Sequence, residues 1–233
     1  MWKRRRGERS QVRTEGGQPI LRHQPRSGGV VPPTSTGSPG VREAIDAHLD
    51  TFLGPCTAVW HEVLSDLVHL DVYMWEPSAE RPMYTFVTVG MSDLPMTVPD
   101  GAVAAGYSRR AELMLCLPAD WPVPNGHDPS ARWQSEAAYF PIRWLKQLAR
   151  LPHEYGSWLG FGHTIPNGEP ARQLEAATEL CGWLLLAPMT LPNEFRHIDL
   201  GQERLDIFGI VGLHQDEMDH KLAHDAEALF DGF

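Results

Sequence analysis

The chain has 233 residues, of which 42% are hydrophobic and 21% are charged, and its formal net charge at pH 7 is −10. This composition is ordinary for a globular protein and excludes a chain that is disordered throughout. No apolar run reaches the roughly 18 residues of a membrane-spanning helix, and the basic N-terminal end lacks the apolar segment of a secretory signal, so we expect a cytoplasmic protein that does not enter a membrane.

Positive charge is concentrated in the first segment of the chain, residues 1–40. This segment holds eight Lys and Arg and two Asp and Glu, whereas the remainder holds twelve and twenty-eight. It combines WKRRRGER with GGQP and GGVVPPTSTGSPG and shows no apolar periodicity, which predicts a disordered basic tail followed by a folded domain over residues 41–233. An acidic domain repels nucleic acid and favours encounter with a basic partner.

Helical spacing opens the folded region and strands follow it. Apolar residues recur between Val41 and Phe52 until Gly54-Pro55 ends the pattern, which predicts a helix. Apolar and polar residues then alternate over residues 68–75, which predicts a strand with the apolar side chains Val68, Leu70, Val72 and Met74 on one face. Residues 84–89 and 111–117 have the composition of two further strands, and the short connections favour antiparallel pairing.

The second half of the chain mixes helices and strands. A helix is predicted over residues 141–151, with Pro141 in its first turn and Pro152 just beyond its end. Residues 183–187 and 205–211 are predicted strands. A last helix is predicted over residues 216–230, with Met218, Leu222, Ala226 and Leu229 facing inward. This irregular order of elements predicts an α+β fold and excludes a regular βαβ alternation.

The strand over residues 84–89 ends abruptly in Gly90-Met91-Ser92-Asp93. A nucleophile elbow needs Gly-x-Ser-x-Gly, and Leu94 occupies the closing position, which argues against a serine hydrolase. The alternative is a structural turn, in which Gly90 frees the backbone, Asp93 caps the turn through its side chain and Pro95 stops further pairing.

Eleven histidines invite a metal interpretation, but the sequence contains no HExxH motif. His220 and His224 are four residues apart on one helical face and could hold a metal, but Lys221 and Asp225 beside them and the apolar stripe on the opposite face favour a solvated surface. His69 and Asp71 share a strand face, and Glu112 on a neighbouring strand would complete an acid–base group. The alternative function is therefore a metal-dependent or acid–base-dependent hydrolase that uses His, Asp and Glu residues.

Aromatic residues gather in the connection over residues 151–168, LPHEYGSWLGFGHTIPNG. Trp158 and Phe161 either plug the end of the sheet or serve recognition, as aromatic residues on loops often do. No GxxxxGKS or GxGxxG motif is present, so we expect no nucleotide cofactor.

Four stretches carry a resemblance to a known family: YTFVTVGMSDLPM, RRAELMLCLPADW, FPIRWLKQLARLPHEYGSWLGFGHTIPNG and LDIFGIVGLHQDEMDHKL. In order and spacing they resemble the suppressor of fused domain over roughly residues 41–233. The resemblance implies a single α+β domain with a mixed, largely antiparallel sheet flanked by helices. It also implies the stand-alone bacterial form, in which Gly90 to Asp93 is a structural turn at a recognition edge.

The same resemblance implies a protein-binding function, because animal members bind transcription factors and stand-alone bacterial members resemble immunity proteins beside polymorphic toxins. It transfers no catalytic residue, cofactor or metal. We therefore expect a protein that neutralises or sequesters a protein partner, in its most specific form a basic co-encoded toxin. The expected partner-binding residues are Asp93, Glu154, Trp158 and Phe161, because exposed aromatic and acidic side chains on connections suit recognition.

Overall fold

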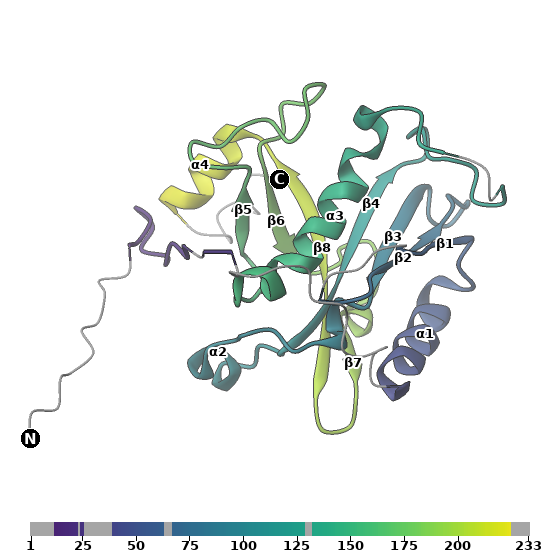
Figure 1. The fold of residues 1–233 in the computed structure, drawn as a ribbon, viewed down its shortest axis with the longest axis horizontal. Helices are drawn as coiled ribbons and strands as arrows, with labels where there is room; N and C mark the ends of the chain where they lie inside the picture. Colours follow the sequence, from purple (N-terminus) through teal and green to yellow (C-terminus); the bar gives the residue numbers. More distant parts are fainter. Residues whose placement is uncertain (1–11, 23, 26–38, 63–66, 129–131, 225–233) are drawn as a thin grey trace, which may run out of the picture.

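A mixed sheet forms the centre of the molecule (Figure 1). The computed structural model describes residues 12–22, 24–25, 39–62, 67–128 and 132–224. The strands are β1 (Ala58–Trp60), β2 (Asp71–Trp75), β3 (Met83–Val89), β4 (Arg110–Pro118), β5 (Thr164–Pro166), β6 (Gly182–Leu186), β7 (His197–Asp199) and β8 (Arg204–Leu213). They are arranged in the order β1-β2-β3-β4-β8-β6-β5, and β7 pairs with β8.

Only the pairing of β4 with β8 is parallel among the described strands; every other pair is antiparallel. The expected α+β fold with a mixed, largely antiparallel sheet is therefore confirmed. Within the described residues, no helix is long and apolar enough to cross a membrane.

Helices cover both faces of the sheet. They are α1 (Pro39–Leu53), α2 (Asp100–Ala104), α3 (Glu136–Tyr155) and α4 (Gln215–Ala223). Buried residues of α3 form one large core with β2, β3, β4, β6 and β8, whereas α1 and α4 pack in two separate clusters against the opposite face. The sheet is thus the middle layer, with α3 on one face and α1 and α4 on the other.

Period-two alternation predicted the large core correctly. Val68, Leu70, Val72 and Met74 are all at most 1% exposed, and the last three belong to the core under α3. The expected helices and strands all appear with shifted ends. Both predicted ends of α3 were wrong: the helix begins at Glu136, so Pro141 lies inside it and not in its first turn, and it continues past Pro152 to a left-handed C-cap at Gly156 (φ 57°). Ser135 starts it by accepting a hydrogen bond from the Ala138 amide.

The final helix is shorter in the described part of the chain than its predicted span. Met218 is buried and Leu222 packs against the same cluster, as expected. Ala226 and Leu229 lie outside the described residues.

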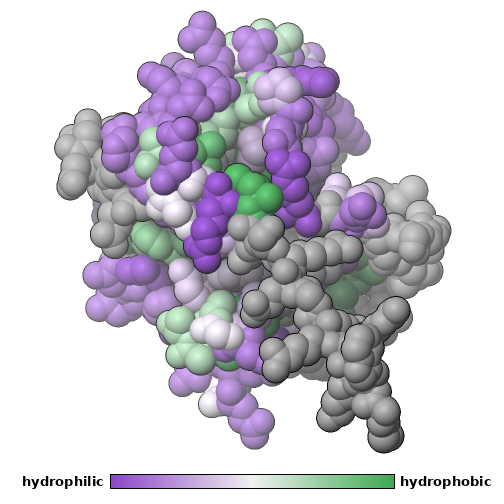
Figure 2. Space-filling model, turned by 90° about the vertical axis from the view of Figure 1, so that its left-hand side faces the viewer, coloured by the Kyte–Doolittle hydropathy of each residue, from purple (hydrophilic) through white to green (hydrophobic). Residues whose placement is uncertain are grey.

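Residues 12–22 make a small hairpin that packs against α4. Arg13 and Pro19 form an antiparallel bridge, and Lys221 Nζ of α4 donates to Gln18 Oε1 over 2.9 Å. This part of the expected disordered tail therefore has a defined conformation. Most of residues 1–40 lie outside the described ranges, and the domain boundary at residue 41 stays a prediction. Figure 2 shows the face of the molecule on this side, where hydrophilic residues surround small hydrophobic patches.

Candidate functional site

The turn after β3 is held by a single buried carboxylate. Residues Met91–Asp93 form a 3-10 turn, η1. Glu112 Oε1 of β4 accepts hydrogen bonds from the Gly90 amide (2.9 Å), the Ser92 amide (3.0 Å) and Ser92 Oγ (2.6 Å). Its Oε2 accepts from Thr88 Oγ1 over 2.7 Å. One side chain therefore satisfies the orphan donors at the start of the turn.

This arrangement corrects the expected capping of the turn. We predicted that Asp93 caps it through its side chain, but η1 has no side-chain cap, and Glu112 satisfies the amides from the neighbouring strand. Gly90 has φ 122°, and a Cβ placed on it would lie 2.0 Å from the carbonyl oxygen of His69. Glycine is thus required both by the backbone conformation and by the close approach of the backbone just before β2.

The predicted acid–base group is only partly assembled. His69 Nε2 lies 3.2 Å from Asp71 Oδ1, but the four hydrogen bonds that Glu112 accepts come from Thr88, Gly90 and Ser92. Burial raises the pKa of Glu112 to about 7, against the lowering effect of its hydrogen-bond donors. Glu112 therefore acts as a structural clamp in this geometry.

Three of the four predicted partner-binding residues, Asp93, Trp158 and Phe161, lie on two connections that contact each other, whereas Glu154, also expected on a connection, lies in the last turn of α3. His153 Nε2 of α3 donates to the Met91 carbonyl over 2.9 Å, and the Thr97 amide donates to the Ser157 carbonyl over 2.9 Å. The Leu159 amide also contacts Met96 Sδ at 3.4 Å. Hydrogen bonds therefore join the β3–β4 connection to the end of α3 and to the α3–β5 connection. We call the surface that they form the paired-loop surface (residues 90–98 and 153–163).

Aromatic packing orders one side of the paired-loop surface. Trp158 is partly buried, with its ring centroid 5.1 Å from that of Tyr107 and 4.3 Å from that of His163, both edge to face. Burial, together with the charge of Lys221, lowers the pKa of His163 to about 4, so its imidazole is neutral at pH 7. Phe161 is 36% exposed and is carried by this ordered loop.

The two acidic candidates occupy different environments. Glu154 is partly buried in the last turn of α3. Asp93 is also partly buried, and burial raises its pKa while the charges of Arg42, Arg110 and His69 lower it. Asp93 therefore belongs to a neighbouring polar cluster as well as to the paired-loop surface.

That polar cluster centres on Asp71, the first residue of β2, and sequence reasoning found only part of it. Asp71 Oδ2 accepts from Arg42 of α1, while Oδ1 lies 2.9 Å from His61 Nδ1. Tyr73 Oη joins the cluster to α1, because it lies 3.2 Å from Arg42 Nη2. The sequence placed His69 and Asp71 on one strand face, but it gave no signal for Arg42 or His61, whose positions depend on helix packing and strand register.

His220 of α4 and His224, the C-cap residue of that helix, stack with ring centroids 4.4 Å apart, and His224 Nδ1 donates to the His220 carbonyl. Within the described part of the chain, no third metal-ligating side chain joins this pair. Their placement fits the solvated face that we weighed against a metal site.

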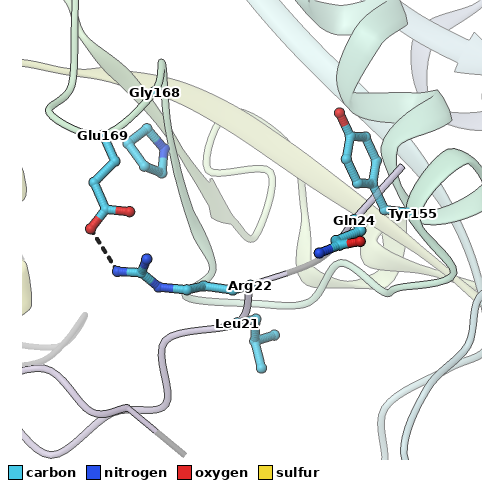
Figure 3. Close-up of a pocket in the computed structure, with 7 residues that line it drawn as sticks. Leu21, Arg22, Gln24, Tyr155, Gly168 and Glu169 are labelled. Atoms are coloured by element: carbon cyan, nitrogen blue, oxygen red, sulfur yellow. Dashed lines mark hydrogen bonds and ion pairs between the residues drawn. The ribbon is translucent and has the colours of Figure 1, made fainter. Parts of the chain in front are cut away.

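A separate groove lies between the N-terminal segment and the turn after β5 (Figure 3). An ion pair between Arg22 Nη2 and Glu169 Oε1, 2.6 Å apart and largely exposed, spans it. Its lining residues are Leu21, Arg22, Gln24, Tyr155, Pro166, Gly168 and Glu169. No two of these lining residues form a catalytic pair of nucleophile and general base. The paired-loop surface is therefore the stronger candidate site.

Comparisons with known proteins agree with this fold. Among solved structures, a protein from Neisseria gonorrhoeae FA 1090 described as a SUFU homolog is 15% identical with a TM-score of 0.58; the match covers 84% of this chain and 90% of that one. A chain in the Sufu–Fu complex crystal structure is 16% identical with a TM-score of 0.54, over 84% and 82%. Drosophila Suppressor of Fused is 16% identical with a TM-score of 0.54, over 87% of this chain and 47% of that one, so this chain spans about half its length.

The TM-scores above 0.5 over more than four fifths of this chain show a shared fold. A search of curated protein sequences found no significant match. A family model described as "Suppressor of fused protein (SUFU)" matches residues 66–233, which is most of the chain and includes the clamped turn and the paired-loop surface. The chain therefore belongs to the suppressor of fused family.

Proposed function

We propose that this protein binds a protein partner through the paired-loop surface. The observation that carries the proposal is the exposed Phe161 ring on a connection whose backbone is fixed by the β3–β4 connection and by Trp158. An exposed aromatic side chain on a rigid support is an effective anchor, because little conformational entropy is lost when it binds. In this proposal Trp158 supports the loop, and Asp93 and Glu154 lie toward the rim.

The family and the charge of the chain support a protein partner. A chain of similar fold is found in the crystal structure of the Sufu–Fu complex, which supports a protein partner for this fold. Residues 41–233 carry twelve Lys and Arg against twenty-eight Asp and Glu. This excess of negative charge attracts a basic partner over long range and accelerates its encounter.

In its most specific form, the proposal is that the protein is an immunity protein that neutralises a basic toxin encoded beside it. The motivating observations are the family membership and the acidic domain. The test is to co-express the protein with each basic protein encoded by a neighbouring gene and to measure growth and complex formation by size-exclusion chromatography.

Wild-type protein should restore growth and co-elute with the toxin. Phe161→Ala should weaken both effects, whereas Met189→Ala should not, because Met189 is an exposed apolar residue (72%) outside the paired-loop surface. Complex formation without protection would reject the immunity role and leave partner binding standing. Equal loss in both variants would reject the assignment of the surface.

A further inference from the structure

Three metal-ligating side chains converge beside the first two strands. The register of β1 and β2 pairs Trp60 with Val72, so continuing it places His61 opposite Asp71. His69 precedes Asp71 by two residues and therefore projects toward the same face. Strand geometry thus brings two imidazoles to one carboxylate.

The atoms are close enough to share a ligand. His61 Nδ1 and His69 Nε2 lie 2.9 Å and 3.2 Å from Asp71 Oδ1, and all three atoms lie within 4.8 Å of one another. In a tetrahedral zinc site, bonds of 2.0 to 2.2 Å place neighbouring ligand atoms about 3.3 Å apart. Two of the three separations already approach this value. The third needs only a movement of an imidazole, and the His61 side chain is 68% exposed and has room to move.

Asp71 is the fixed point of the group. Its side chain is 1% exposed, and Arg42 holds its other oxygen, Oδ2. The guanidinium therefore orients the carboxylate as outer partners orient metal ligands, leaving Oδ1 directed at the two histidines. Among the described residues, this is the only group of three or more His, Cys, Asp or Glu side chains with such spacing.

We propose that His61 Nδ1, His69 Nε2 and Asp71 Oδ1 form a binding site for a divalent transition metal, with Zn²⁺ as the reference ion. Two imidazoles and one carboxylate suit zinc and its neighbours in the first transition row, whereas Mg²⁺ and Ca²⁺ prefer sites made of oxygen alone. Three protein ligands leave a fourth position for water. The proposal does not depend on the proposed partner-binding function.

The test is calorimetric titration of the full-length protein with Zn²⁺ in a buffer that does not chelate metal, after removal of any added histidine tag. His61→Ala and His69→Ala each remove one ligand from a partly exposed position. His220→Ala is the matched control, because it removes a histidine from the exposed pair on α4. Circular dichroism at each titration temperature verifies that every variant is folded, and if one ligand variant unfolds, the other decides.

We expect one equivalent of Zn²⁺ to bind to the wild-type protein and to His220→Ala with equal affinity. Each ligand variant should bind more than about tenfold more weakly, because one of three ligands is lost. Mg²⁺ should not compete. The proposal is overturned if the wild-type protein binds no Zn²⁺, if the folded ligand variants bind it as tightly as the wild type, or if only His220→Ala loses binding.

Discussion

Replacing Glu112 by Gln and by Ala separates two properties of this buried side chain: its capacity to accept hydrogen bonds and its ionisation. Gln keeps an oxygen that can accept from Gly90 and Ser92, and its amide group can donate to Thr88 Oγ1. Thr88 Oγ1 can then turn its hydrogen toward the Leu113 carbonyl, 3.5 Å away. Ala removes every acceptor, so two backbone amides and two hydroxyls lose their partner, and only the Thr88 hydroxyl has another acceptor, the Leu113 carbonyl.

The magnitudes follow from these contacts. A buried donor left unsatisfied costs about 1 to 3 kcal/mol, so three of them predict that Glu112→Ala lowers the free energy of unfolding by more than about 3 kcal/mol. The effect of Glu112→Gln depends instead on the pKa of the wild-type carboxyl group that it replaces. Burial raises the pKa of Glu112 from 4.5 to about 7. Ionising this carboxyl group therefore costs the native state about 3 kcal/mol more than it costs the unfolded state.

The sign of the pH dependence is defined by this raised pKa. The contribution of Glu112 to stability is fully present below pH 4.5 and is lost as the pH rises to about 7, by up to roughly 1.4 kcal/mol per pH unit. Gln has no proton to lose. The free energy of unfolding of Glu112→Gln minus that of the wild type should therefore increase by about 3 kcal/mol between these limits, while other titrating groups cancel in the difference.

Urea denaturation at several pH values between 4.5 and 8, followed by the fluorescence of the eight tryptophans, measures this difference directly. Two results would refute the reasoning. One is a difference between wild type and Glu112→Gln that stays constant with pH. The other is a Glu112→Ala protein as stable as Glu112→Gln, which would mean that the clamp contributes nothing to the turn.

Two further predictions concern the turn and the core. Gly90→Ala should cost at least about 2 kcal/mol in urea denaturation, because its Cβ would lie 2.0 Å from the His69 carbonyl oxygen, whereas Gly106→Ala, also at positive φ but in open space, should cost roughly 1 kcal/mol; equal costs would contradict the steric argument. Leu148→Ala on the buried face of α3 should lower the free energy of unfolding by about 2 to 5 kcal/mol, and a cost below about 1 kcal/mol would contradict its place in the core.

The sequence predicted the long elements because their periodicity reports burial directly. The alternating residues from Val68 to Met74 are buried as expected. The strands β1, β5 and β7 were missed, because three residues are too few to reveal an alternating pattern. Both ends of α3 were predicted wrongly because each was assigned from a proline, Pro141 and Pro152, whereas the helix extends past both, from the Ser135 cap to the left-handed Gly156.

In the candidate site, too, features set by neighbouring residues were predicted, and contacts between residues far apart in the sequence were not. Gly90 was correctly expected at a turn, because a strand followed by Gly is a local signal. The clamp by Glu112 joins residues 20 or more positions apart, and the position of His61 depends on the register of β1. Neither contact can be derived from spacing along the chain until the order of the strands is known.

Partner binding by the paired-loop surface is tested most directly by comparing dissociation rates. With the cognate partner immobilised, Phe161→Ala should dissociate faster by a factor that corresponds to about 2 kcal/mol or more, since an anchor acts mainly on dissociation. Asp93→Ala should mainly slow association at low salt, as expected for a charged residue at the rim. Met189→Ala should retain wild-type kinetics. Wild-type dissociation of a well-folded Phe161→Ala protein would contradict the account.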